Sequence, residues 1–397
     1  MQDPSTVQTA RKAARFLFRV PLVVVLFAAL WGILWWQLSG EWSVNDQYSY
    51  GWFVPLFAIV LFWLRWEDAP QPHAAAEAPN SKLQAPRLRS AIGIAIVALL
   101  LLFPIRLFEI GNPDWRLLSW LHALCVVAIT LVFLRSAGGA PWLRHFAFPV
   151  AFTLIAVPWI SPIEQPIVQG LMRIVAAISS ETVALFGIPA RLEGHLIRIP
   201  DGVIGVNEAC SGVRSLQTSL MIGLLFGELK RLSIFRRVVL VVAAAAIAFV
   251  GNCIRAFFLV WVAATKNVAA ANRWHDFAGY GIVALVFLGT MILAKFLSGP
   301  KKPRATTKLE SKKAKVENGS SGHFYFLLPT FYFAAAIGWI VFSEIAAATW
   351  YRAHEHDLAQ SVRWEVQWPQ SASNFHEIKI DDDVRRILRF DQGHAAS

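Results

Sequence analysis

Residues 237–262 read RVVLVVAAAAIAFVGNCIRAFFLVWV, and the only charged side chains in this run are Arg237 at its start and Arg255 near its end. A helix rises about 1.5 Å per residue, so the run is long enough to cross the ~30 Å hydrocarbon layer of a bilayer. The stretch therefore predicts a membrane-spanning helix. Arg255 lies about 27 Å from Arg237 along this helix, close to the opposite membrane surface.

Apolar runs of comparable length recur along the chain. Its 397 residues are 56% hydrophobic and only 16% charged, and the mean hydropathy is +0.48. The further runs are 20–38, 52–66, 90–108, 117–134, 146–160, 213–228, 278–297 and 324–349. The pattern predicts an all-α polytopic membrane protein with about nine transmembrane helices.

A weaker run, 163–187, is interrupted by Arg173 and Glu181. If it crossed the membrane, the basic residues of 229–237 would fall on the outer side, against the positive-inside rule. We therefore expect 163–187 to form an interfacial or re-entrant helix.

The distribution of Lys and Arg predicts the orientation. Under this scheme 22 of the 37 basic residues lie in segments on one side, namely 1–19, 65–89, 135–145, 229–237 and 295–323. Basic loops tend to remain in the cytoplasm, so the N-terminus is expected there. The C-terminal tail is thus predicted to lie outside.

These expectations divide the chain into five parts. They are a cytoplasmic basic N-terminal tail (1–19), a transmembrane domain (20–297), a cytoplasmic basic linker (298–322), an additional transmembrane helix (323–349) and an extracytoplasmic tail (350–397).

Several functional classes are disfavoured by composition. The net charge of +11 resides in loops that flank helices, which argues against nucleic-acid binding. These basic residues are better explained as topology signals, and 301–315 is expected to contact anionic lipid headgroups.

Cys125 and Cys253 lie inside apolar runs and are expected to be inert packing residues. His354 and His356 lack a matching set of ligands, so we expect neither a metal nor a cofactor.

The third cysteine, Cys210, lies in a different setting. It follows 194–206, whose alternating apolar residues and glycines predict a small β-hairpin on the outer surface, and it precedes a helix beginning near Gly212. The positive end of a helix dipole favours thiolate over thiol. Arg214, one turn further on, is expected to add to this effect.

Two later segments are predicted to bring partners to the same membrane depth. Arg255 is expected to face the bundle, with Asn252 on the same helix face, because an arginine facing lipid is costly. His275 and Asp276 lie in a predicted outer loop, 272–277. A nucleophile, a positive charge for an oxyanion and an acid/base group match thiol acyl transfer. Taken one by one, these residues could equally be a structural cysteine, an interface anchor and a loop histidine.

The sequence also resembles the exosortase/archaeosortase family. The resemblance rests on Val206-Asn-Glu-Ala-Cys-Ser-Gly-Val-Arg-Ser215, Ala248-Phe-Val-Gly-Asn-Cys-Ile-Arg255 and His275-Asp276. It extends to Tyr48-Ser-Tyr-Gly-Trp-Phe-Val-Pro55, similar to the family's Ser-His-Gly region, although Tyr50 stands in place of the usual histidine. It covers roughly residues 20–297.

The resemblance implies a multi-pass membrane cysteine protease or transpeptidase. Cys210 would be the nucleophile, Arg255 would stabilise the oxyanion or orient substrate, and His275 would handle protons, so 20–297 would be a catalytic domain. The protein would lie in a bacterial cytoplasmic (inner) membrane, with the active site facing the periplasm. The substrates would be secreted proteins with a C-terminal sorting signal of the PEP-CTERM kind, and the acceptor an envelope or polysaccharide group or water. The tail resembles the start of a periplasmic companion domain found with some exosortases, and 362–369 and 375–380 have strand-like alternation.

Two other classes remain open at the level of sequence. A transporter or exopolysaccharide-export component would explain the many helices and the charges at Arg173 and Glu181. A non-catalytic scaffold would need only apolar surfaces and loops. Both predict that Cys210 is dispensable.

Overall fold

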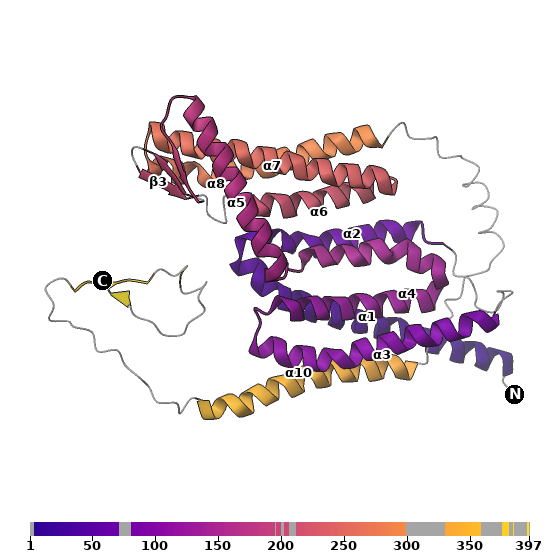
Figure 1. Cartoon of the computed structure of the whole chain (residues 1–397). Coiled ribbons are helices and arrows are strands. Elements are labelled where there is room, and N and C mark those ends of the chain that lie inside the picture. The colour runs from indigo at the N-terminus through magenta and orange to yellow at the C-terminus, as the bar shows by residue number, and fades with distance from the viewer. Residues whose placement is uncertain are drawn as a thin grey trace.

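The computed structural model describes residues 4–70, 81–194, 196–199, 202–205, 212–298, 330–358, 375–380, 384 and 395–396. Long helices dominate this part of the chain and lie side by side (Figure 1). They are α1 (Pro4–Val44), α2 (Phe53–Glu67), α3 (Ser81–Gly111), α4 (Arg116–Phe152), α5 (Ser161–Leu185), α6 (Val213–Leu229), α7 (Ile234–Thr265), α8 (Val268–Leu297) and α10 (Thr330–Leu358). The 3-10 helices η1 (Asp46–Trp52) and η2 (Thr153–Ala156) lie between them.

Eight segments among the described residues are long and apolar enough to cross a membrane, which confirms the predicted fold class. They are 21–44, 46–67, 90–111, 116–156, 161–185, 234–265, 268–297 and 331–354. The helices extend past the apolar runs seen in the sequence, and α10 ends at Leu358 instead of residue 349. Polar residues continue a helix into water without leaving an apolar pattern, so sequence alone placed these ends too early.

The element α4 is a pair of antiparallel helical arms. Gly139 has φ 72°, outside helical geometry, and interrupts the helix there. Beyond it the chain returns, since the indole Nε1 of Trp120 donates a 2.8 Å hydrogen bond to the carbonyl of Pro158. The predicted span 117–134 therefore lies in the first arm of α4, and 146–160 begins in the second arm and continues through η2, with the turn at the predicted inner side.

Helix α5 lies across one end of the bundle. At its start Glu164 pairs with Arg116 at the beginning of α4, and near its end Phe186 stacks edge-on against Trp261 in the last part of α7. Between them Val175 packs in a buried cluster with Val260 of α7. Figure 1 shows α5 running across the ends of α6, α7 and α8. Although α5 is long enough to span, its contacts support the interfacial placement expected for 163–187.

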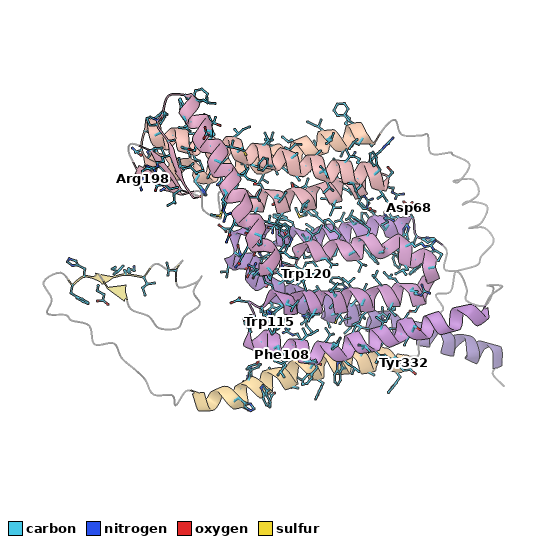
Figure 2. All side chains as sticks on the ribbon, in the orientation of Figure 1. Asp68, Phe108, Trp115, Trp120, Arg198 and Tyr332 are labelled. Carbon is cyan, nitrogen blue, oxygen red and sulfur yellow. The ribbon has the colours of Figure 1, made fainter. Side chains whose placement is uncertain are left out.

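A three-stranded antiparallel sheet follows α5. Its strands are β1 (Arg191–Glu193), β2 (Leu196–Ile199) and β3 (Gly202–Gly205), with the order β1-β2-β3. The register pairs Ile197 with Ile204, and Ile197 is fully buried. The predicted hairpin is thus present and gains one extra strand. In Figure 2, Arg198 of this sheet and Asp68 beyond α2 lie at opposite ends of the helices.

The end of the bundle near Asp68 is joined by a buried ionic cluster around Glu228 of α6. Arg65 of α2 donates through Nε to Glu228 Oε1 at 2.6 Å, and Arg237 of α7 donates to Oε2 at 2.7 Å. Arg65 also donates to the backbone carbonyl of His145 at 2.9 Å. These bonds fix α2, α4, α6 and α7 to one another at this end.

Two short strands occur in the C-terminal tail. Strand β4 (Glu377–Ile378) pairs antiparallel with β5 (Ala395–Ala396). The predicted strand at 375–380 thus contains β4, whereas 362–369 lies outside the described residues.

Candidate functional site

Arg255 and His275 meet at the end of the bundle away from Asp68. Arg255 lies in the last third of α7 and is only 9% exposed. Its Nη2 lies 2.9 Å from Nε2 of His275 and also donates to the His275 main-chain carbonyl at 3.4 Å. The sequence predicted that these two residues share a membrane depth, and the structure places them in direct contact.

The contact defines the tautomer of His275. A guanidinium can only donate, so Nε2 of the imidazole must accept. The proton of the neutral ring therefore sits on Nδ1, which lies 3.0 Å from Oδ1 of Asp276. Oδ1 of Asp276, an exposed carboxylate, is thus the acceptor for the Nδ1 proton.

His275 lies inside a helix, which corrects the prediction of a loop at 272–277. Helix α8 begins at Val268 because the Asn267 side chain accepts a 2.7 Å hydrogen bond from the backbone amide of Ala270. The alanines that follow are strong helix formers. Sequence missed this turn because Asn272 and Arg273, both exposed, interrupt the apolar pattern.

Asn252, one turn before Arg255 on α7, connects the site to the start of α6. It is 1% exposed. Gly212, the N-cap of α6, adopts φ 84° and approaches so closely that a Cβ there would lie 2.5 Å from Asn252 Nδ2. Gly279 of α8 is similarly near, with a Cβ position 3.7 Å from Arg255 Nη2. The starts of α6 and α8 therefore converge on the same part of α7.

Cys210, the predicted nucleophile, lies outside the described residues. It precedes Gly212 by two positions in the chain. The other two cysteines are free thiols, Cys125 buried in α4 and Cys253 half-buried in α7. Cys253 packs against an apolar cluster, as expected for an inert residue.

Arg214, the other predicted support, is exposed and donates a 3.1 Å hydrogen bond to Oγ of Ser49 in η1. Tyr50, which follows Ser49 in the chain, is 6% exposed and donates to the carbonyl of Ile155 at 2.9 Å. The position at which the resemblance led us to expect a histidine is therefore a packed tyrosine.

A buried cluster that sequence reasoning missed supports η1. Glu164 of α5 accepts hydrogen bonds from Gln47 and Tyr48 of η1 and from Arg116 of α4. Arg116 also donates to Glu41 of α1 at 3.0 Å. The available signal was the pair of charges Arg116 and Glu164 at the edges of apolar runs, since charges there are costly unless partnered.

On the sheet beside the site, Arg198 donates to both carboxylate oxygens of Glu193, at 3.1 and 3.0 Å. This hydrogen bonding, together with the positive charge of Arg198, lowers the pKa of the Glu193 carboxyl below its ordinary value. Within the described residues no group of three or more His, Cys, Asp or Glu side chains could hold a metal ion.

One comparison with known proteins bears on this site. The family model described as transmembrane exosortase matches residues 35–292. The matched region contains Cys210, Arg255 and His275 and ends before α10. No curated protein and no solved structure matches the chain.

Proposed function

Because the chain belongs to the transmembrane exosortase family, we propose that it is a membrane-embedded cysteine protease or transpeptidase. It acts on the C-terminal sorting signals, of the PEP-CTERM kind, of exported proteins. The observation that carries the proposal is the 2.9 Å contact between Arg255 and His275, formed beside the helix start that Cys210 precedes.

The proposed reaction begins with Cys210. Its thiol gives a proton to Nε2 of His275, and the thiolate attacks the scissile carbonyl carbon, forming a C–S bond while the carbonyl π electrons move to oxygen. As the substrate enters, its carbonyl oxygen replaces His275 Nε2 as the acceptor of the Arg255 N–H, so that Nε2 can take the thiol proton. The guanidinium, which is 9% exposed, then stabilises the oxyanion by its charge and its N–H donors.

Collapse of this intermediate breaks the C–N bond. The leaving amine of the C-terminal fragment takes the proton back from His275, and a thioester remains on Cys210. An amine of an envelope acceptor, or water, then attacks the thioester and restores the thiol. Asp276 keeps the Nδ1 proton of His275 in place throughout, so that Nε2 is always the nitrogen that exchanges the proton.

Orientation is part of the proposal. The site faces the periplasm, where exported substrates arrive, and the basic segments face the cytoplasm. A substrate whose signal includes a transmembrane helix would present its motif at this end of the bundle.

The proposal is tested by Cys210→Ala and Cys210→Ser in the native host. Loss of the C-terminal segment of a sorting-signal protein is followed by blotting, with Cys125→Ala as the matched control. We expect both Cys210 variants to reach the membrane at normal levels and to stop processing, while the control processes normally. Unchanged processing in the Cys210 variants would refute the thiol mechanism and favour a transport or scaffold role.

A further inference from the structure

A cavity of about 750 Å³ lies between α1, α2 and both arms of α4. Aromatic and aliphatic side chains form most of its walls, among them Phe27, Trp31, Phe62, Trp63 and Leu134. It is unrelated to the Arg255–His275 site, which lies on α7 and α8.

The cavity offers almost nothing to a polar ligand. Thr130 and Thr153 line it, but their hydroxyls donate to the backbone carbonyls of Val126 and Val150 at 2.7 and 2.6 Å. The indole of Trp142 donates to the carbonyl of Pro70 at 2.8 Å. Since these groups are satisfied within the protein, the occupant must be apolar.

The extent of the cavity along the helices matches one leaflet. Its lining runs from Val23 to Trp35 on α1 and from Ala58 to Trp66 on α2, which at 1.5 Å per residue is about 18 Å and 12 Å. Half of the ~30 Å hydrocarbon layer is about 15 Å. The cavity occupies the half of the bundle away from the Arg255–His275 site.

These dimensions distinguish an acyl chain from a helix. A spanning helix is about 10 Å wide and needs the full ~30 Å, and even a 15 Å length of it fills about 1,200 Å³. An acyl chain of one leaflet is thinner and has the required length. The side of the cavity is open to lipid, because the lining residues Val24, Ile59 and Trp63 are between 55% and 61% exposed.

Charge at the near end of the cavity indicates the headgroup. The turn between the arms of α4 is flanked by the cavity-lining residues Leu134 and Trp142. Arg135 follows Leu134 directly in the sequence, and the exposed Arg144 lies two positions after Trp142. Basic side chains beside a gap between transmembrane helices attract anionic headgroups. We propose that the cavity binds one acyl chain of an anionic phospholipid from this leaflet, with its headgroup at Arg135 and Arg144.

Filling the cavity tests the acyl-chain site. Full-length protein is reconstituted in vesicles of equal phosphatidylglycerol and phosphatidylethanolamine, extracted in mild detergent, and its retained lipid is measured by native mass spectrometry. Ala28, which lines the cavity, is changed to Trp; Val25, on the same helix but not in the lining, is changed to Trp as the control. We expect Ala28→Trp to reduce retained lipid at least about tenfold and the control to retain it.

The headgroup assignment is tested separately with Arg135→Gln and Arg144→Gln. Arg236→Gln, in the first turn of α7 at the same end of the bundle, is the control. Each of the first two should lower the preference for phosphatidylglycerol about fivefold. Equal lipid retention in Ala28→Trp and wild type would overturn the site, and an unchanged preference in both arginine variants would overturn the headgroup assignment. A photo-crosslinker at position 59 that links to a second protein chain instead of lipid would show that the occupant is a protein.

Discussion

The guanidinium of Arg255 makes two hydrogen-bond contacts with His275, one to the ring nitrogen and one to the main-chain carbonyl. Its planar fork can keep one of these contacts while another N–H donates to a developing oxyanion. A lysine at this position carries the same charge on one nitrogen at the end of a flexible stem and lacks the rigid planar arrangement of donors. The shape of the side chain, and not only its charge, is therefore expected to matter for catalysis.

We accordingly predict that Arg255→Lys lowers kcat/KM for a sorting-signal peptide by at least about 100-fold, the usual cost of losing one oxyanion donor. Membrane levels should remain near those of wild type. Arg273→Lys, an exposed arginine two residues before His275, is the control and should cost less than about threefold. Full activity in Arg255→Lys would remove the guanidinium from the mechanism.

Gly212 allows a test of how closely α6 must approach Asn252. Gly212→Ala would put a Cβ in a left-handed backbone at a cost of about 1–2 kcal/mol, and would also displace the Asn252 amide 2.5 Å away. Gly194→Ala carries the same backbone cost, with φ 69°, but meets no atom within 4 Å. We predict that both lower the unfolding temperature, Gly212→Ala by more because of the added contact with the buried Asn252, and that only Gly212→Ala also lowers kcat. Equal activity in the two variants would contradict a role for this approach.

The sequence predicted which residues share a depth but not how they touch. The rise of a helix and the length of a loop are enough to bring Arg255, Asn252 and His275 to one end. The direct contact depends on α8 starting at Val268, where the Asn267 side chain caps the helix by accepting a hydrogen bond from the backbone amide of Ala270. The Glu164 cluster escaped prediction because its members come from four separate elements.

At the scale of elements, the lengths of the apolar runs predicted the spanning helices. The reversal inside α4 was predicted from the two apolar runs and the inner segment 135–145 between them. The interfacial or re-entrant placement of 163–187, expected from the basic residues that follow α6, stays a prediction, because α5 is also long and apolar enough to span. Helix ends were predicted less well, because α8 and α10 continue through polar residues that water solvates.

Helix α10 lies outside the family match, yet it is attached to the matched domain by a buried ionic network. Arg106 of α3 donates to Glu344 of α10 at 2.6 and 3.0 Å and to Glu109 at 2.8 Å. Glu109 in turn contacts His122 of α4 at 3.0 Å. Arg106, Glu109 and His122 are each less than 8% exposed, so the network belongs to the interior.

Glu344→Gln removes one charge from this network and leaves Arg106 less fully compensated. Hydrogen bonds to charged groups contribute about 1.5–3 kcal/mol, so the variant should unfold at a measurably lower temperature in detergent. Thr349→Val on the exposed face of the same helix is the control. If both variants unfold at the wild-type temperature, α10 is held by its apolar contacts alone.

At the scale of the whole molecule, two polar clusters lie at opposite ends of the bundle, in addition to the interior network around Arg106. One end carries Arg255, His275 and the Glu164 cluster, and the other carries Arg65, Glu228 and Arg237. The apolar cavity between α1, α2 and α4 lies in the second half. This separation fits the proposed function, in which substrates arrive at one surface and anchoring interactions lie at the other.

The length of α7 places these two ends on opposite sides of the membrane, and the side that each end faces can be measured. The helix has 32 residues and so extends about 48 Å, well beyond the ~30 Å hydrocarbon layer. Lys230 before it and Lys266 after it, both exposed, must therefore lie on opposite sides. In a background without native cysteines, we predict that Lys266→Cys reacts with a membrane-impermeant maleimide in cells with a permeable outer membrane, and that Lys230→Cys reacts only after the inner membrane is opened. The reverse labelling would place the Arg255–His275 site in the cytoplasm, where an exported substrate could not reach it after translocation.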